Sequence, residues 1–268
     1  MIKDITIGQY IPGDSFVHKL DPRVKILISL TFIANLFIVD NFNGYIFIVL
    51  FTFISIFISK IHLRYIYKGL KPIFVLILIT ALLNLFMTGG TTVVFKWQFL
   101  TVYKEGIVLA AFMVLRLVFL IIGTSLLTLT TSPIELTDGI EKLLNPFKRL
   151  GVPAHELAMM MTIALRFIPT LMDETDKIMK AQTARGADFE SGSLVKRAKN
   201  LIPILVPLFI SSFRRADELA MAMESRCYRG GEGRTRMKIL KLTGRDFTAT
   251  AATVALVAAS IMSRIVLA

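Results

Sequence analysis

The chain has 268 residues, of which 54% are hydrophobic and 19% are charged. Soluble domains average about 45–50% apolar residues, so the excess indicates a protein of the lipid bilayer. The formal net charge of +12 would suit nucleic acid, but outside residues 131–246 most basic residues flank apolar runs, which excludes a nucleic-acid groove and is typical of membrane topology.

Five apolar segments are candidates for membrane-spanning helices. They cover residues 24–39, 45–59, 70–87, 107–129 and 247–267. A helix needs about 20 apolar residues to cross the bilayer, so the first two segments must recruit flanking residues. Turn-forming residues at 40–44 separate the first pair, and residues 91–103 predict a small hairpin around Trp97.

The basic residues around the first four segments predict the orientation of the chain. Eight of them lie on one side of these segments, and only Lys96 and Lys104 lie on the other. By the positive-inside rule the N-terminus is cytoplasmic, and five spans leave the C-terminus outside. The first residues lack the basic start and apolar core of a signal peptide, so we expect insertion without cleavage.

Arg116 falls near the middle of the fourth apolar segment. A charge at that depth is costly, which makes the residue a candidate intramembrane functional charge. A structural pair within the bundle, with Glu105 or with the hydroxyls of Thr124 and Ser125, would also explain it. We slightly favour the structural interpretation.

Residues 131–246 form a large insertion before the last apolar segment. They hold 19 of the 31 basic and 14 of the 19 acidic residues, together with long apolar stretches. This mixture is typical of helices that lie at the membrane surface and also dock to protein. Ser132, Pro133 and Glu135 carry the signals of a helix start, and that short helix should end before Pro146.

Two long helices follow in the insertion. One is expected from about 152 to 186, with a bend at Pro169, and the other from about 194 to 228, disturbed by Pro203 and Pro207. The sequence therefore predicts an all-α polytopic membrane protein with about five transmembrane helices. It divides into a four-helix membrane region (1–130), a cytoplasmic domain of long amphipathic helices (131–246) and a final span (247–268).

Each long helix is expected to end in an arginine motif. The first motif is Ala184-Arg185-Gly186, and the second, at the end of the next helix, is Ser225-Arg226-Cys227. A basic residue before a left-handed cap complements the helix dipole, which is a common structural role. The duplication and the small neighbouring residues favour a second interpretation, in which each guanidinium donates to carbonyls or carboxylates of a docked partner.

Methionines are frequent on the same two helices. They are either ordinary packing residues or an adaptable surface for several partners, and the sequence favours neither. The seven are Met159, Met160, Met161, Met172, Met179, Met221 and Met223.

Motifs for catalysis are missing from the sequence. No lysine is followed by Ser or Thr, so the chain has no P-loop, and His155-Glu156 is not followed by a second histidine at zinc-protease spacing. One cysteine cannot form an internal disulfide or a metal site built from several cysteines. We therefore predict no catalytic residue and no metal site in this chain.

Several longer motifs match those of one known family. They are Thr131-Ser132-Pro133, Pro153-Ala154-His155-Glu156-Leu157-Ala158, Leu165-Arg166-Phe167-Ile168-Pro169-Thr170, Lys180-Ala181-Gln182-Thr183-Ala184-Arg185-Gly186 and Tyr228-Arg229-Gly230-Gly231 after Arg226. They strongly resemble the transmembrane T component of energy-coupling factor (ECF) transporters, a branch of the ATP-binding cassette (ABC) importers. The likeness covers essentially the whole chain.

The resemblance implies a non-catalytic scaffold subunit of a vitamin or micronutrient importer in the cell (plasma) membrane. Arg185 would hold one of two cytoplasmic ATPases and Arg226 the other, while the chain also contacts a small integral-membrane substrate-binding subunit. ATP would be bound by the partner ATPases, so this chain needs no cofactor of its own. Ser225 and Cys227 depart from the family pattern, which leaves Arg229 as an alternative second contact.

Other functions stay open at this point. A conventional importer permease would form the substrate pathway itself, and a membrane-embedded enzyme would need a catalytic constellation near one membrane face. The sequence names neither the substrate nor the number of interchangeable substrate-binding subunits.

Overall fold

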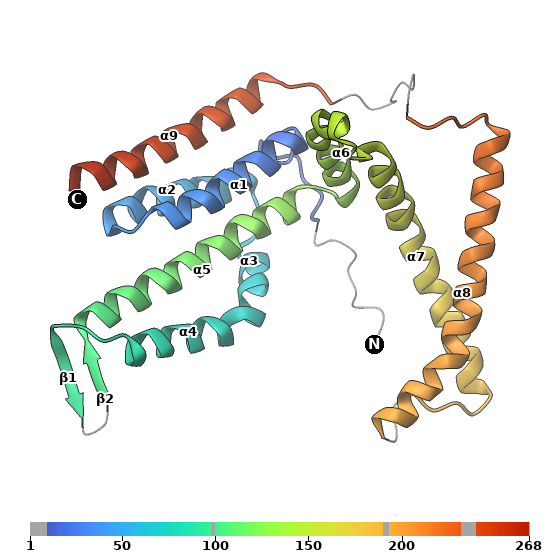
Figure 1. Ribbon diagram of the computed structural model, residues 1–268, viewed down its shortest axis with the longest axis horizontal. Helices are drawn as coiled ribbons and strands as arrows, with labels where there is room; N and C mark the ends of the chain where they lie inside the picture. Colours follow the sequence, from blue (N-terminus) through green and yellow to red (C-terminus); the bar gives the residue numbers. More distant parts are fainter. Residues whose placement is uncertain (1–9, 98–99, 190–192, 232–239, 268) are drawn as a thin grey trace. The chain divides into compact units, whose positions relative to one another are not determined.

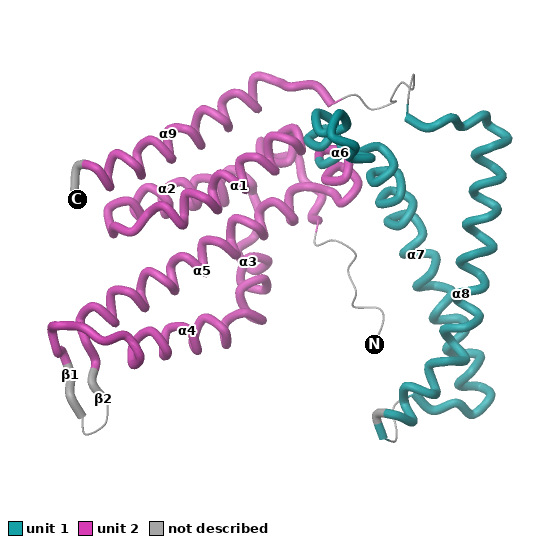
Figure 2. Tube along the Cα trace, in the orientation of Figure 1, with its two compact units in different colours: residues 1–7, 140–238 teal, residues 8–139, 239–268 magenta. Residues whose placement is uncertain are grey.

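The computed structural model describes residues 10–97, 100–189, 193–231 and 240–267, and these residues are almost entirely helical (Figure 1). The chain divides into two compact units (Figure 2). The first, here called the membrane unit, comprises residues 8–139 and 239–268. The second, here called the arm unit, comprises residues 1–7 and 140–238.

The membrane unit contains most of the apolar helices. Its elements are α1 (Pro22–Ile38), α2 (Phe42–Ser59), α3 (Leu63–Leu70), a short 3-10 turn η2 (Lys71–Ile73), α4 (Phe74–Met87), β1 (Val93–Trp97), β2 (Leu100–Tyr103), α5 (Lys104–Thr130), the start of α6 (Pro133–Leu144) and α9 (Gly244–Leu267). Four helical stretches in the described residues, 42–59, 63–87, 104–130 and 244–265, are long and apolar enough to cross a membrane. The prediction of an all-α polytopic membrane protein is confirmed.

The helix formed by the first predicted span is short. α1 has 17 residues, below the ~20 residues that a perpendicular span requires. It packs against α5 and α9 instead of standing alone. Four of the five predicted spans thus fall in helical stretches long and apolar enough to cross a membrane, and α1, from the first predicted span, is not among these four.

The third predicted span is broken in the structure. Where one helix over 70–87 was expected, α3 ends at Leu70, and η2 contains Pro72 before α4 begins at Phe74. Pro72 lies in the first turn of η2, a position that proline favours because its missing backbone N–H would have no partner there. Figure 1 shows the chain changing direction between α3 and α4.

The core of the membrane unit lies between α1, α2, α5 and α9. Phe32, Leu36 and Ile48 are at most 4% exposed and pack with Ile122 and Leu256. Many other apolar side chains on the outer faces are exposed, among them Phe53, Phe57, Phe74, Val75 and Met87. Large exposed apolar faces on helices of this length suit contact with lipid chains rather than water.

The predicted hairpin is present in the described residues. β1 and β2 pair antiparallel before α5 begins. Glu105, in the first turn of α5, accepts hydrogen bonds from the hydroxyls of Thr91 and Thr92 at 2.9 and 3.1 Å. The carboxylate thereby joins the start of α5 to the start of the hairpin.

Two aspartates near opposite ends of the chain join the first and last helices. Asp21 is the N-cap of α1, and its carboxylate accepts from the backbone N–H and the guanidinium of Arg23. The backbone N–H of Asp21 in turn donates to Asp246 Oδ1 at 2.8 Å. Asp246 Oδ2 also accepts from the backbone N–H and hydroxyl of Thr243 at the start of α9. The starts of α1 and α9 are therefore linked through two buried aspartates, Asp21 and Asp246, and both oxygens of each carboxylate accept hydrogen bonds.

We expect Asp21 to make the stability of the membrane unit depend on pH. Burial alone would raise the pKa of Asp21, but hydrogen bonds from Arg23 and the charges of Arg23 and Lys25 outweigh it and lower the pKa below 3.8. A lowered folded-state pKa stabilises the protein above the unfolded value, and the gain is lost as the pH falls through the folded value.

The test compares the unfolding temperatures of the wild type and Asp21→Asn in detergent. Their difference should be constant between about pH 5 and about pH 8 and should shrink below about pH 4. An exposed aspartate, Asp14→Asn, is the control and should show no such pattern. A difference between wild type and Asp21→Asn that is equal at all pH values would contradict the expected role of the ionised carboxylate.

The arm unit contains the remainder of α6, a 3-10 segment η3 (Asn145–Leu150), α7 (Ala154–Ala184) and α8 (Leu194–Ser225). The start of α6 belongs to the membrane unit. There Ser132 caps α6 as predicted, because its hydroxyl accepts a hydrogen bond from the backbone N–H of Glu135. η3 ends at Gly151, whose φ of 86° is the left-handed conformation that glycine adopts easily. α7 and α8 run as continuous helices of 31 and 32 residues through Pro169, Pro203 and Pro207.

Candidate functional site

The end of α7 is a closed turn that presents Arg185. The backbone N–H of Gly186 donates to the Thr183 carbonyl at 2.9 Å, and that of Ala187 donates to the Gln182 carbonyl at 3.0 Å. Gly186 has a φ of 87°. This pair of bonds around a left-handed residue is a Schellman motif, in which Arg185 is the C-cap.

The end of α8 repeats this turn. The backbone N–H of Cys227 donates to the Glu224 carbonyl at 2.8 Å, and that of Tyr228 donates to the Met223 carbonyl at 3.0 Å. Cys227 has a φ of 56°. Arg226 is the C-cap with φ −93° and ψ 14°, close to the −86° and 5° of Arg185. The duplicated motif therefore has one backbone structure at both positions, although glycine is replaced by cysteine.

Both caps expose the predicted contact residues. All six residues of the two motifs are exposed, namely Ala184, Arg185, Gly186, Ser225, Arg226 and Cys227. Neither guanidinium forms a hydrogen bond or ion pair with a residue that the structure describes. Five donors on each arginine are thus free for a partner, and small neighbours allow a partner's backbone to approach.

Arg229 occupies a different place from Arg226. It is exposed but lies beyond the left-handed residue, at the position that Asp188 holds after α7. The two turns therefore match at Arg185 and Arg226, and their charges differ three residues later. This match favours Arg226 as the counterpart of Arg185.

Replacing Cys227 by glycine should stabilise the cap of α8. A left-handed conformation costs a non-glycine residue about 1–2 kcal/mol, and glycine adopts it freely. In Cys227→Gly we expect amide exchange at position 227 and at Tyr228 to slow by roughly fivefold, the ratio that about 1 kcal/mol corresponds to. Gly186→Ala is the matched control, and exchange at its own cap should accelerate. Unchanged exchange in both variants would show that the caps do not control these amides.

α7 and α8 contact one another in the arm unit, and Figure 1 shows them crossing. Arg215 Nη2 lies 2.7 Å from Glu174 Oε2 at this contact. The side-chain amide of Asn200 donates to the Asp188 carbonyl in the turn after α7. Sequence reasoning missed the ion pair, although the spacing between its two residues equals the spacing between the two arginine motifs.

Arg116 caps the end of α1. Its Nε donates to the Leu36 carbonyl at 3.1 Å, and its Nη2 donates to the Val39 carbonyl and to Asp40. The guanidinium also lies over the Phe37 ring, 5.3 Å from its centre. The suggested partners Glu105, Thr124 and Ser125 are not used. Glu105 is occupied by the hairpin, and Thr124 bonds a carbonyl of its own helix.

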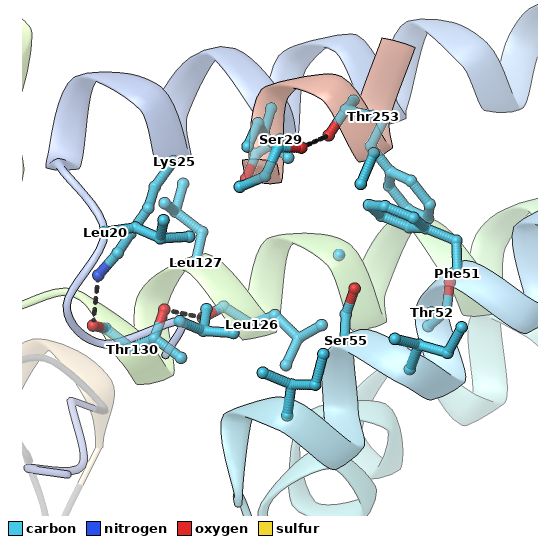
Figure 3. A pocket seen from close by; sticks show the side chains of 18 of the residues that line it. Leu20, Lys25, Ser29, Phe51, Thr52, Ser55, Leu126, Leu127, Thr130 and Thr253 are labelled. Atoms are coloured by element: carbon cyan, nitrogen blue, oxygen red, sulfur yellow. Dashed lines mark hydrogen bonds between the residues drawn. The ribbon is translucent and has the colours of Figure 1, made fainter. Parts of the chain in front are cut away.

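A cavity of about 250 Å³ lies inside the membrane unit (Figure 3). Its walls are aliphatic and aromatic side chains with hydroxyls of Ser29, Thr52 and Ser55, and the described lining contains no carboxylate, histidine or cysteine. Lys25 lies at one end and donates to the carbonyls of His18 and Thr130 at 3.0 and 2.9 Å. The arrangement ties α1 to the end of α5.

Metal-binding groups do not gather among the described residues. No cluster of three or more His, Cys, Asp and Glu side chains lies at ligating distance there. His155 lies at the start of α7, and its Nδ1 is 3.2 Å from Glu141 Oε1. Gly231 packs against the His155 ring and leaves no room for a larger side chain. His155 thus has packing and pairing contacts within the arm unit.

Comparison with known proteins gives a consistent result. The CbiQ family model, described as a cobalt transport protein, matches residues 13–238. A curated relative from Clostridium kluyveri, energy-coupling factor transporter transmembrane protein EcfT, is 77% identical over 99% of this chain and 98% of its own length. Proteins of the same name from Thermosediminibacter oceani and Bacillus subtilis are 62% and 52% identical, over 99% and 92% of this chain and 100% and 93% of their own lengths.

Proposed function

The chain belongs to the CbiQ family and is the transmembrane component of an energy-coupling factor transporter, and we propose that it joins two cytoplasmic ATPases to a membrane substrate-binding subunit. In this proposal Arg185 docks into one ATPase and Arg226 into the other. The complex imports a vitamin or another micronutrient. ATP binds to the ATPases, and this chain is a non-catalytic scaffold.

The observation that carries the proposal is the repeated Schellman cap. Two exposed guanidiniums without a described partner stand on two turns of the same backbone geometry, one at the end of α7 and one at the end of α8. One helix end of this kind is common, whereas two copies on helices that touch suit a partner present as two similar subunits. Arginine is the side chain best suited to such contacts, because its planar fork donates to carbonyls and carboxylates in a defined geometry.

An apolar stripe on α8 supports the third partner. Large side chains between 47% and 65% exposed recur every three to four residues on this helix, which is the spacing of one helix face: Leu201, Ile202, Leu205, Val206, Phe209, Ile210 and Phe213. Met160, Met161 and Met221 are exposed on the two long helices as well. A stripe of this length suits an apolar partner, and we assign it to the membrane substrate-binding subunit.

The orientation of the chain is part of the proposal. The distribution of basic residues favours a cytoplasmic N-terminus and cytoplasmic arms, with the C-terminus outside. That orientation places both arginine caps in the compartment that contains the ATPases. Movement of the ATPases on binding and hydrolysing ATP would then pass through α7 and α8 to the substrate-binding subunit.

The relatives do not favour the rival functions. A conventional permease would line a pathway with two copies of itself, and a membrane enzyme would turn over a substrate alone. Native mass spectrometry of the solubilised complex separates these cases. We expect one copy of this chain with two ATPase subunits and one substrate-binding subunit, and two copies of this chain in each complex would overturn the scaffold proposal.

A further inference from the structure

The crossing of α7 and α8 carries an ion pair at matched positions. Glu174 precedes Arg185 by the same number of positions as Arg215 precedes Arg226. The two side chains meet with Arg215 Nη2 2.7 Å from Glu174 Oε2, and Arg215 is 32% and Glu174 21% exposed. Each member of the pair therefore stands at the same distance before the arginine cap of its own helix.

The two helices run antiparallel through this point. Two contacts join these helices, Glu174 with Arg215 and Asp188 with Asn200. Between them the residue number rises along α7 and its following turn, and it falls along α8 by a similar number of residues. An antiparallel pair of equivalent helices has a local two-fold axis where equivalent positions meet. Glu174 and Arg215 are equivalent positions, because the spacing between them equals the spacing between Arg185 and Arg226. The ion pair thus marks the local two-fold axis.

This position makes the two arginine caps equidistant from the crossing. The three turns of α-helix between ion pair and cap correspond to about 16 Å, so each cap lies about that far along its own helix. If α8 slid along α7, the antiparallel caps would change their separation. A contact on the axis therefore holds α7 and α8 against sliding with one interaction.

We propose that Glu174 and Arg215 are positioning residues that set the separation of Arg185 and Arg226, so that both caps fit a pair of ATPase subunits. The inference rests on the proposed function and adds the element that fixes its geometry. Neither residue needs to touch an ATPase. Their role is to hold the crossing while force passes along the arms.

Asp173 and Arg214 provide a matched control. They directly precede the pair on each helix, carry opposite charges and have the same spacing in the sequence. Both are exposed, and neither forms a hydrogen bond or ion pair with a residue that the structure describes. Substitutions at these positions change the same charges on the same helices without touching the crossing.

The separation of the caps can be measured directly by pulsed electron–electron double resonance. Spin labels are placed on the native Cys227 and on a cysteine at Ala187→Cys in the full chain in lipid nanodiscs. We expect Glu174→Ala and Arg215→Ala to shift and broaden the distance distribution, and the exchanged pair Glu174→Arg with Arg215→Glu to narrow it again. Asp173→Ala and Arg214→Ala should match the wild type. Single variants with the wild-type distribution, or an exchange that restores nothing, would overturn the inference.

Uptake by the assembled transporter gives the second readout. Because the pair is partly exposed, each single variant should lose roughly two- to fivefold in coupled uptake, with recovery in the exchanged pair and both ATPases still bound. Wild-type uptake in both single variants overturns the positioning role.

The two proposals can fail separately. If Arg185→Glu and Arg226→Glu retain both ATPases while the label distances still respond to the ion pair, the docking proposal fails and the crossing contact stands. If the arginine variants lose the ATPases while the distances and uptake ignore Glu174 and Arg215, the positioning role alone fails.

Discussion

Arg185→Glu and Arg226→Glu should each release a different ATPase from the solubilised complex. A central arginine at an interface typically contributes at least about 2 kcal/mol, so reversing its charge should weaken binding by about 30-fold or more. Because each arginine stands on its own helix end, one variant should leave the other contact intact. Quantitative co-purification of this chain with its two ATPases measures both losses.

Two variants serve as controls for this result. Lys180→Glu reverses an exposed charge on α7, five residues before Arg185, and should keep both ATPases. Arg229→Glu tests the alternative second contact, and because Arg229 lies beyond the cap we expect only a small loss. If Arg229→Glu removed the second ATPase and Arg226→Glu did not, the second contact would be reassigned. Undiminished binding in all variants would reduce the arginines to helix-end charges.

Arg116→Met should destabilise the membrane unit. The guanidinium donates to two carbonyls at the end of α1 and pairs with Asp40, and its side chain is only 16% exposed. Removing it leaves buried carbonyls without a donor, which costs about 1–3 kcal/mol. We expect the unfolding temperature in detergent to fall by roughly 5 °C, given the usual slope for a chain of this size.

Arg264→Met is the matched control for that measurement. Arg264 donates to the Ile38 carbonyl at 3.1 Å near the same end of α1, but its side chain is 54% exposed. Its loss should cost little, because water replaces the donor. Arg116→Lys retains the charge without the planar fork and should lie between wild type and Arg116→Met. Equal unfolding temperatures for Arg116→Met and Arg264→Met would contradict the capping role.

The partners of Arg116 lie at the end of another helix. In the sequence it is a charge in the middle of an apolar segment, and its partners lie far back along the chain, at the end of α1. Its donors satisfy carbonyls at the end of the short α1, which gives this charge a structural role. The pairs suggested from nearby positions were wrong, because local spacing on α5 does not say where α1 ends.

The sequence by itself determined the class of the protein and the ends of its long helices. Apolar segment length predicts spans because the bilayer thickness sets their size. The repeated arginine motif predicted two equivalent helix ends, because Schellman caps depend on a few adjacent residues. Those properties are local, so neighbouring residues contain the information.

Only the tertiary structure decided which distant groups meet. The link from Asp21 to Asp246, the cap on α1 by Arg116 and the crossing pair Glu174–Arg215 all join residues that are far apart in the sequence. Each depends on how whole helices pack, and that packing is the sum of many weak contacts that no short motif encodes.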